Sequence, residues 1–162
     1  MYPGDPLPRV AEHAVSEGGR PGAASGRLTR LVGALTRGKE YEVAVRAVRG
    51  AVQLERDEAG HMHEQVEELL AAVLERNGLT ADDLISIWFT ATPDLHSDFP
   101  AAAARRVGIV DVPLICAQEL DIEGAMPRVV RLLAHVESDL PKSRIAHVYL
   151  GAAAALRKDI AQ

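Results

Sequence analysis

The sequence predicts an α/β or α+β domain in which helices pack against a β-sheet. Short apolar runs that fit buried strands alternate with amphipathic segments that fit helices, in the order β-α-β-α-β-α-β over residues 43–162. Apolar residues make up 48% of the 162-residue chain, which is enough for one sizeable core. Three helices cover only one face of a single sheet well, so we expect a partner subunit on the other face.

Composition argues against several classes of protein. No apolar run approaches the roughly 18–20 residues of a membrane-spanning helix, so no membrane association is expected. The single cysteine rules out an intrachain disulfide and suits a reducing compartment, which predicts a cytoplasmic protein. A net charge of -5 argues against nucleic acid as the main partner. A few local arginines can still create a site for a small anion.

Residues 1–42 differ in composition from the rest of the chain. They are rich in Gly, Pro, Ser and Ala and lack sustained strand or helix patterning, so we predict a disordered N-terminal extension ahead of a domain at 43–162. Only residues 27–35 could form a short helix. The apolar part is too short and too far from the terminus for a signal peptide. A further hypothesis is that translation starts at Val43.

The domain begins with a predicted strand and helix. Residues 43–49 alternate apolar and other side chains up to Gly50, a pattern typical of a strand. The next apolar residues recur at helical spacing and form one face of an amphipathic helix, which ends at Asn77 and Gly78. The residues of this face are Met62, Val66, Leu69, Leu70, Val73 and Leu74.

Shorter elements follow in the middle of the chain. Residues 80–83 allow a turn or two of helix before a buried strand at 85–90. A short helix is predicted at 100–107, with Asp98 as its cap, because a capping residue followed by proline is typical of a helix start. Residues 112–117 form another predicted strand.

The C-terminal part is predicted to contain a second long helix at 125–137 and a last strand at 147–150. Intrinsic propensity also favours a helix at 152–156, although the run is too short to hold one alone. The long helix would bury Met126, Val129, Val130, Leu133 and Val136.

Several polar residues fit ordinary structural roles. His61 and His63 are two positions apart on a helix and diverge by about 200°, so no metal site is expected there. Asp94, His96 and Asp98 fit capping and turn roles, because the chain has no nucleophile elbow, phosphate-binding loop or dinucleotide fingerprint. A lone strand cysteine such as Cys116 is usually a small buried apolar residue.

Two arginines are more informative than the rest. Most arginines on helices are simply solvated. Arg131 is expected at the border of the apolar stripe of the second long helix rather than opposite it. Arg49 ends the first strand just before a glycine, a position from which side chains reach into a cleft. The other arginines considered are Arg46, Arg105, Arg106 and Arg128.

A series of separated motifs resembles one known family. The sequence is similar to the small monofunctional chorismate mutases of the trimeric α/β type, over nearly all of residues 43–162. The motifs that carry the resemblance are VRAVRGA at 45–51, ATPDLH at 91–96, FPAA at 99–102, CAQELD at 116–121, Arg131, HVYL at 147–150 and LR at 156–157.

This resemblance implies a fold and an activity. The fold would be a mixed sheet with helices on one side, and three subunits would form a pseudo-α/β-barrel with active sites at their interfaces. Residues 152–156 would be extended or irregular. The activity would be the Claisen rearrangement of chorismate to prephenate, on the route to phenylalanine and tyrosine. The reaction is intramolecular and requires no nucleophile, metal or cofactor.

The resemblance also implies roles for the catalytic residues. Arg131 would donate a hydrogen bond to the ether oxygen of the breaking bond, where negative charge develops. Glu119 and Cys116 would contact the ring hydroxyl, with Glu119 facing the partial positive charge of the ring. Arg49 and Tyr149 would hold a substrate carboxylate.

The remaining implied contacts surround the substrate. Phe99 and Leu156 would wall the ring and exclude water, and Arg105 and Arg157 would lie near the mouth of the cleft. One departure from the family is Ala102, because relatives can carry a lysine there. Weaker substrate capture is the most that this change is expected to cause. The further predicted substrate contacts are Ala101, Leu114 and Ile115.

Two other functions are also compatible with the sequence. One is a non-catalytic trimer that binds a small anionic metabolite on the same scaffold. The other is an enamine/imine deaminase, a trimer of related architecture with an arginine at its interface. The combination of Glu119, Arg131 and Tyr149 favours the mutase, because the deaminases carry different motifs.

Overall fold

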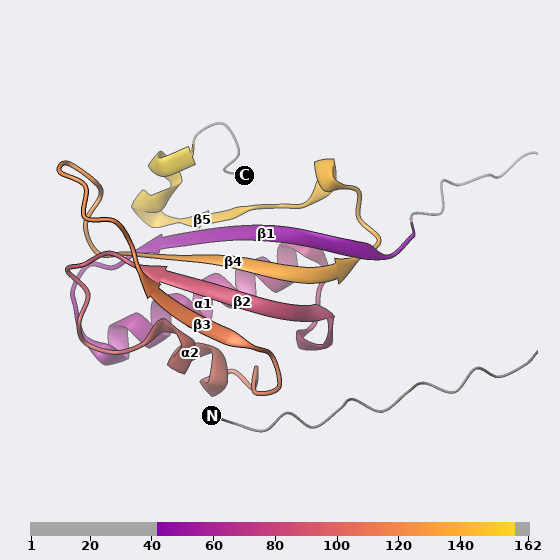
Figure 1. The fold of residues 1–162 in the computed structure, drawn as a ribbon, viewed down its shortest axis with the longest axis horizontal. Helices are drawn as coiled ribbons and strands as arrows, with labels where there is room; N and C mark the ends of the chain where they lie inside the picture. Colours follow the sequence, from indigo (N-terminus) through magenta and orange to yellow (C-terminus); the bar gives the residue numbers. More distant parts are fainter. Residues whose placement is uncertain (1–41, 158–162) are drawn as a thin grey trace, which may run out of the picture. The chain divides into compact units, whose positions relative to one another are not determined.

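A computed structural model of the chain describes residues 42–157 and contains one five-stranded mixed sheet (Figure 1). The predicted extension at 1–42 falls outside the described residues, apart from its last position. The strands lie in the order β3-β2-β4-β1-β5, so β4 is central. Strand β4 is antiparallel to β1 and β2, whereas β5 is parallel to β1 and β3 is parallel to β2. The strand bounds are β1 (Ala44–Gln53), β2 (Leu84–Ala91), β3 (Leu114–Gln118), β4 (Val129–Ser138) and β5 (Val148–Leu150).

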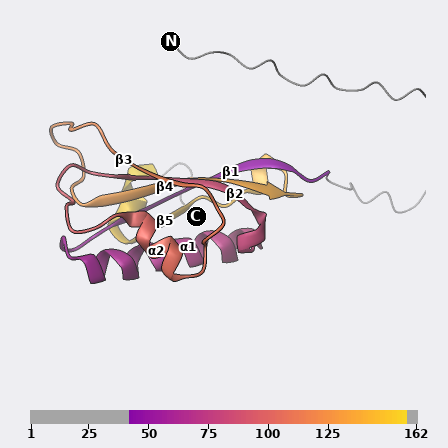
Figure 2. The ribbon, with the colours of Figure 1, turned by 60° about the horizontal axis from the view of Figure 1, so that its bottom comes forward.

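The α-helices lie on one face of this sheet, as Figure 2 shows. Helix α1 (Ala59–Asn77) ends where Gly78 takes the left-handed conformation with φ 62°, which glycine adopts without steric cost. No helix of residues 42–157 is both long and apolar enough to cross a membrane. The other helical segments are α2 (Pro100–Arg106) and the short 3₁₀ helices η1 (Ala81–Asp83), η2 (Lys142–Arg144) and η3 (Gly151–Arg157).

The main core lies between the sheet and the helices. The predicted apolar face of α1 packs there, and alternate residues of β1 and β4 meet it from the sheet. Gly50 allows the close packing, because a Cβ at this position would lie 3.2 Å from side-chain atoms of both Leu69 and Leu132. The buried core residues contributed by the two strands are Val48, Val52, Val130, Leu132, Ala134 and Val136.

The long helix predicted at 125–137 was wrong. Residues 129–138 form β4, the central strand, and every one of them pairs with β1. Apolar residues lie on both faces of this strand, so their spacing in the sequence also fits a helix. The backbone hydrogen bonds that β4 forms with β1 and β2 favour the strand over the helix that the local spacing suggests. The element order therefore lacks the second long helix, and Arg131 lies on a strand.

Other boundaries differ less. Strand β1 continues through Gly50 to Gln53, where the prediction ended it at the glycine. Phe99, not Asp98, is the N-cap residue of α2, although Oδ1 of Asp98 accepts a 2.7 Å hydrogen bond from the Phe99 N–H. The extended or irregular conformation implied for 152–156 was also wrong, because these residues lie in η3. The remaining predicted strands and the helical turn near 80–83 are confirmed.

Candidate active site

A row of side chains crosses the sheet on the face opposite α1 and α2, which we call the open face. Strand pairing aligns Thr90 with Arg131, Arg131 with Ala51, and Ala51 with Tyr149. Paired residues on adjacent strands project to the same side of a sheet. The residues next to them in β2 and β4, such as Phe89 and Leu132, are buried on the helix side. The strand order thus brings Thr90, Arg131 and Tyr149 to one surface.

Arg131 forms an ion pair with Glu119, which follows the end of β3. One carboxylate oxygen of Glu119 accepts from Nη1 of Arg131, and the other accepts a 2.6 Å hydrogen bond from the Thr90 hydroxyl. The backbone N–H of Glu119 donates to the Ala91 carbonyl at 2.9 Å and extends the β2–β3 ladder. The side chains of Arg131 and Glu119 are only 30% and 18% exposed. A cation and an acceptor are therefore held side by side at a partly desolvated position.

The start of β4 is anchored by Asp94. The Thr92 hydroxyl donates to Oδ1 of Asp94 at 2.5 Å, and the Arg128 N–H donates to both carboxylate oxygens at 2.9 and 3.1 Å. Burial alone would raise the pKa of Asp94, but these hydrogen bonds outweigh it and lower the pKa. Arg128 has a φ of 51°, which is unusual for a residue other than glycine. Asp94 holds this strained position three residues before Arg131.

Two cavities adjoin Arg131. One, of about 420 Å³, lies on the open face and is lined by Arg49, Trp88, Thr90, Arg131 and Tyr149 among others. The Tyr149 hydroxyl is buried and has no hydrogen-bond partner among the described residues, which is unfavourable unless a ligand supplies one. The other cavity, of about 400 Å³, lies between Asp94, Glu119 and the loop that precedes β4.

A second group of predicted residues lies around β3 and α2. Phe99 and Cys116 line a separate cavity of about 160 Å³. Cys116 and Leu114 pack toward the main core on the helix side of the sheet, and Ala101 is buried in α2. Arg105 is exposed in the last turn of α2. We call these residues the β3–α2 group, and the structure does not bring them to the open-face cavity of the same chain.

Burial raises the pKa of the Cys116 thiol, although the backbone N–H of Ala101 and the charge of Arg105 act against the shift. A raised pKa leaves less thiolate at neutral pH, and the thiolate is the nucleophilic form. The environment of Cys116 is therefore that of a packing residue.

Two of the remaining predicted contacts, Ile115 and Leu156, lie on the open face or beside it. Ile115 is 47% exposed on the open face, where it pairs with Trp88. Leu156 packs against the small cluster that contains Tyr149 and Ala153. The side chain of Arg157 lies outside what the structure describes.

Among the residues that line the open-face cavity, sequence reasoning missed the polar Thr90 and the aromatic Trp88. Both lie on β2, where residues of the open face alternate with buried Ile87 and Phe89. That alternation was visible in the sequence. Only the pairing with β4 shows that Thr90 lies beside Arg131 and Glu119.

These features define a mixed-sheet domain with a cavity lined by two arginines on the uncovered face of its sheet. The family model for chorismate mutase type I matches residues 45–160. Chorismate mutase AroH of Thermus thermophilus is 44% identical over 117 residues, which cover 72% of this chain and 96% of the relative. The corresponding enzyme of Bacillus subtilis is 37% identical over 117 residues, covering 72% and 92%.

A solved structure of a chorismate mutase from Clostridium thermocellum gives a TM-score of 0.67 at 40% sequence identity. The match covers 68% of this chain and 98% of that one. The chain belongs to the chorismate mutase type I family. It is a chorismate mutase, an isomerase of aromatic amino-acid biosynthesis. The family, the mixed-sheet fold and the activity predicted from the sequence are confirmed.

Proposed function

We propose that the ion pair of Arg131 and Glu119 is the catalytic centre for the rearrangement of chorismate to prephenate. The observation that carries this proposal is their contact on the open face, beside a cavity that also contains Arg49 and Tyr149. A cation and a carboxylate held together can act on opposite sides of a polarised bond without entering the reaction covalently.

The chemistry of the rearrangement fits these two groups. As the C–O bond breaks, negative charge builds on the ether oxygen and the ring becomes electron-poor. A guanidinium N–H of Arg131 donates to that oxygen, while Glu119 accepts from the ring hydroxyl and faces the ring. Thr90 already satisfies one oxygen of Glu119 and fixes its orientation. The preorganised pair thus favours the transition state over the ground state.

Arg49 and Tyr149 bind a substrate carboxylate in this proposal. Both line the open-face cavity together with Arg131. A carboxylate would supply the acceptor that the buried Tyr149 hydroxyl lacks among the described residues. Binding of this carboxylate, together with the contacts of Arg131 to the ether oxygen and of Glu119 to the ring hydroxyl, would hold chorismate in the compact conformer from which the rearrangement proceeds.

We further propose that the site is shared between subunits of a homotrimer. In one chain the β3–α2 group is separated from the open-face cavity, so Phe99, Cys116, Arg105, Ala101 and Leu114 cannot wall the same substrate as Arg131. The open face also exposes Trp88 at 52% and Ile115 at 47%, apolar area that a subunit contact would bury. The β3–α2 group of one subunit would then close the cavity of the next, with Leu156 and Arg157 at its border.

We place the enzyme in the cytoplasm, because one cysteine suits a reducing compartment. Residues 43–162 form the mutase domain in this proposal, and residues 1–42 an extension outside it. Neither a cofactor nor a metal takes part in the proposed steps.

The test is turnover of chorismate by the purified full-length chain, without cofactor or metal. We expect loss of the diene absorbance of chorismate, prephenate as the sole product and a severe defect in Arg131→Ala. Sedimentation should give the mass of a trimer. No turnover by folded protein would favour the anion-binding or deaminase alternatives. A monomer at working concentration would contradict the shared site.

A further inference from the structure

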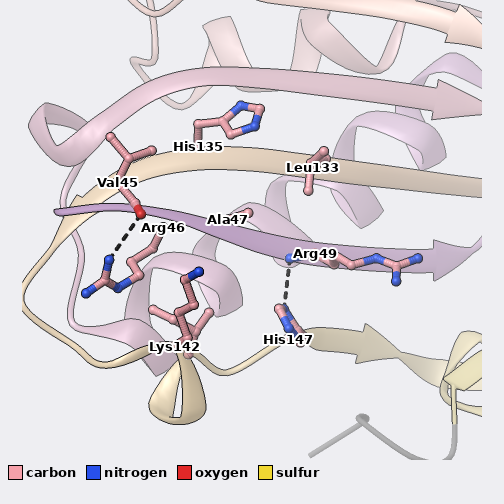
Figure 3. A pocket seen from close by; sticks show the side chains of 9 residues that line it. Val45, Arg46, Ala47, Arg49, Leu133, His135, Lys142 and His147 are labelled. Atoms are coloured by element: carbon pink, nitrogen blue, oxygen red, sulfur yellow. Dashed lines mark hydrogen bonds between the residues drawn. The ribbon is translucent and has the colours of Figure 1, made fainter.

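Another pocket on the open face, of about 510 Å³, lies between β1, β4 and the connection that leads to His147 (Figure 3). The subunit contact proposed above would cover this face of the sheet. The α1 helix lies on the other face, where it binds the segment that leads into α2. That segment ends at Phe99, one of the residues expected to wall the substrate of the neighbouring subunit. The contacts between α1 and this segment therefore affect the shared site.

His63 of α1 is hydrogen-bonded to Asp98, the residue before Phe99. Nε2 of His63 lies 2.9 Å from one carboxylate oxygen of Asp98, and the other oxygen accepts from the Phe99 N–H at 2.7 Å. The hydrogen bonds from the Phe99 N–H and from His63 lower the pKa of Asp98, against the opposing effect of desolvation. An ionised carboxylate only accepts, so Nε2 of His63 donates. Asp98 thus connects α1 to the backbone of Phe99.

The segment before α2 is held at consecutive residues. The side chains of His63 and Asp98 are 13% and 34% exposed, so their hydrogen bond is partly shielded from water. Asp57, in the connection between β1 and α1, accepts from the N–H groups of His96 and Ser97 at 2.9 and 3.1 Å. Hydrogen bonds to a charged acceptor are stronger than those between neutral groups. The backbone is therefore fixed up to the start of α2.

The side chain of Phe99 has little support of its own within one chain. Phe99 is 70% exposed, which suits a residue that meets a neighbouring subunit. It is the N-cap residue of α2, and its carbonyl accepts from the Ala102 N–H at 2.9 Å. The position of the ring therefore depends on the backbone contacts that precede it, of which the bridge through Asp98 is the nearest.

We propose that His63 is a positioning residue that holds Phe99, through Asp98, against the substrate of the neighbouring subunit. This inference rests on the proposed function, in which Phe99 walls the ring of chorismate. Without the hydrogen bond from His63, the start of α2 moves and the aromatic wall moves with it. Such a wall contacts the substrate in the ground state and in the transition state alike. Its displacement therefore raises KM and leaves kcat nearly unchanged.

A second contact between α1 and α2 provides a matched control. Glu67 lies four residues after His63, on the same side of α1, and accepts from Nε of Arg106 at 2.7 Å. Arg106 is in the last turn of α2, at the end remote from Phe99. Glu67→Gln weakens a contact between the same two helices without touching the bridge to Phe99. It should leave KM at the wild-type value.

The first test is steady-state kinetics of full-length variants with chorismate. His63→Leu removes the donor but keeps an apolar side chain at this half-buried position, and we expect KM to rise about threefold to tenfold with kcat within about twofold. His63→Gln can place an amide N–H close to the position of Nε2 and should recover most of the loss. In a Phe99→Ala background, His63→Leu should cause no further rise in KM, because both changes act through one contact.

The second test needs no turnover. The chain contains two phenylalanines, Phe89 in the core and Phe99, so protein labelled with 4-fluorophenylalanine gives two ¹⁹F resonances that Phe99→Ala assigns. In His63→Leu, the resonance of Phe99 should move toward its position in the unfolded protein while that of Phe89 stays unchanged. Glu67→Gln should move neither resonance.

Four results would overturn the proposal: a wild-type KM in His63→Leu, equal losses in His63→Leu and His63→Gln, an additive loss in the Phe99→Ala background, or an unmoved Phe99 resonance in His63→Leu. Failure of the proposed function would be seen differently, as absent turnover by the unlabelled wild-type protein. The ¹⁹F spectra would still decide in that case whether His63 holds Phe99.

Discussion

Thr90 holds Glu119 by a 2.6 Å hydrogen bond from its hydroxyl to one carboxylate oxygen, while the second oxygen of Glu119 contacts Arg131. Thr90 is a positioning residue in this arrangement. We expect Thr90→Val to lower kcat about tenfold with little change in KM, because a hydrogen bond to a charged group contributes roughly 1.5–3 kcal/mol. Thr90→Ser keeps the hydroxyl and should retain most of the activity. Steady-state kinetics of both variants, with thermal unfolding as a check on folding, measures the effect. Equal losses in the two variants would contradict a role for the hydroxyl.

Arg131→Ala should be far more damaging. Its removal leaves the charge on the ether oxygen without a donor in a partly dry cavity, at a cost of about 3–4 kcal/mol, or roughly 10²–10³-fold in kcat. Arg131→Lys should recover only part of this, because an ammonium cannot donate to two groups in the geometry of a guanidinium. Arg106→Ala is a suitable control, since Arg106 is an exposed cation paired with Glu67 on α1. A loss of less than tenfold for Arg131→Ala would refute the assignment.

Tyr149→Phe should weaken substrate binding without lowering thermal stability. The buried hydroxyl has no partner among the described residues, so its removal should leave thermal stability unchanged or raise it slightly. KM for chorismate should rise by about threefold to tenfold if the hydroxyl donates to a substrate carboxylate. A structural role predicts a fall in melting temperature with unchanged KM. Measurement of both quantities on one preparation decides between the two roles.

Cys116 should react slowly with thiol reagents. Burial raises the pKa of its thiol, so the thiolate is scarce at neutral pH. With Ellman's reagent, we expect the native protein to react much more slowly than the protein unfolded in denaturant, and the native rate to rise with pH. Cys116→Ala should keep substantial activity, because the rearrangement needs no nucleophile. Rapid labelling at pH 7, or an inactive but folded Cys116→Ala, would contradict this interpretation.

Much of the fold could be predicted where burial is one-sided. Helix α1 has one apolar face and a clear glycine stop, and both were recognised. Strand β4 was misassigned because apolar residues occupy both of its faces. Val130 and Leu132 meet the helices, whereas Val129 and Leu133 lie on the open face. Such a strand carries no period-2 signal, and its identity depends on pairing with β1 and β2.

The site depends even more on non-local pairing. Glu119 and Arg131 are separated by a loop, and their contact follows from the strand order β3-β2-β4. No local pattern determines that order. Arg131 was first singled out for a position on a helix that does not exist. Its assignment depended on the resemblance to known mutases, and Thr90, which belongs to no quoted motif, was overlooked.

Asp94 should make the stability of the protein depend on pH. Its pKa is lowered in the folded state, so its contribution is fully present above the ordinary value near 3.8 and is lost as the pH falls through the lower folded value. Asp94→Asn weakens the hydrogen bonds to the Arg128 N–H and the Thr92 hydroxyl. We expect a loss of about 1 kcal/mol in the free energy of unfolding at pH 7. Denaturant unfolding from pH 7 to pH 3 should show the two proteins converging in acid. A difference that stays constant over this range would show that ionisation of Asp94 does not stabilise the start of β4.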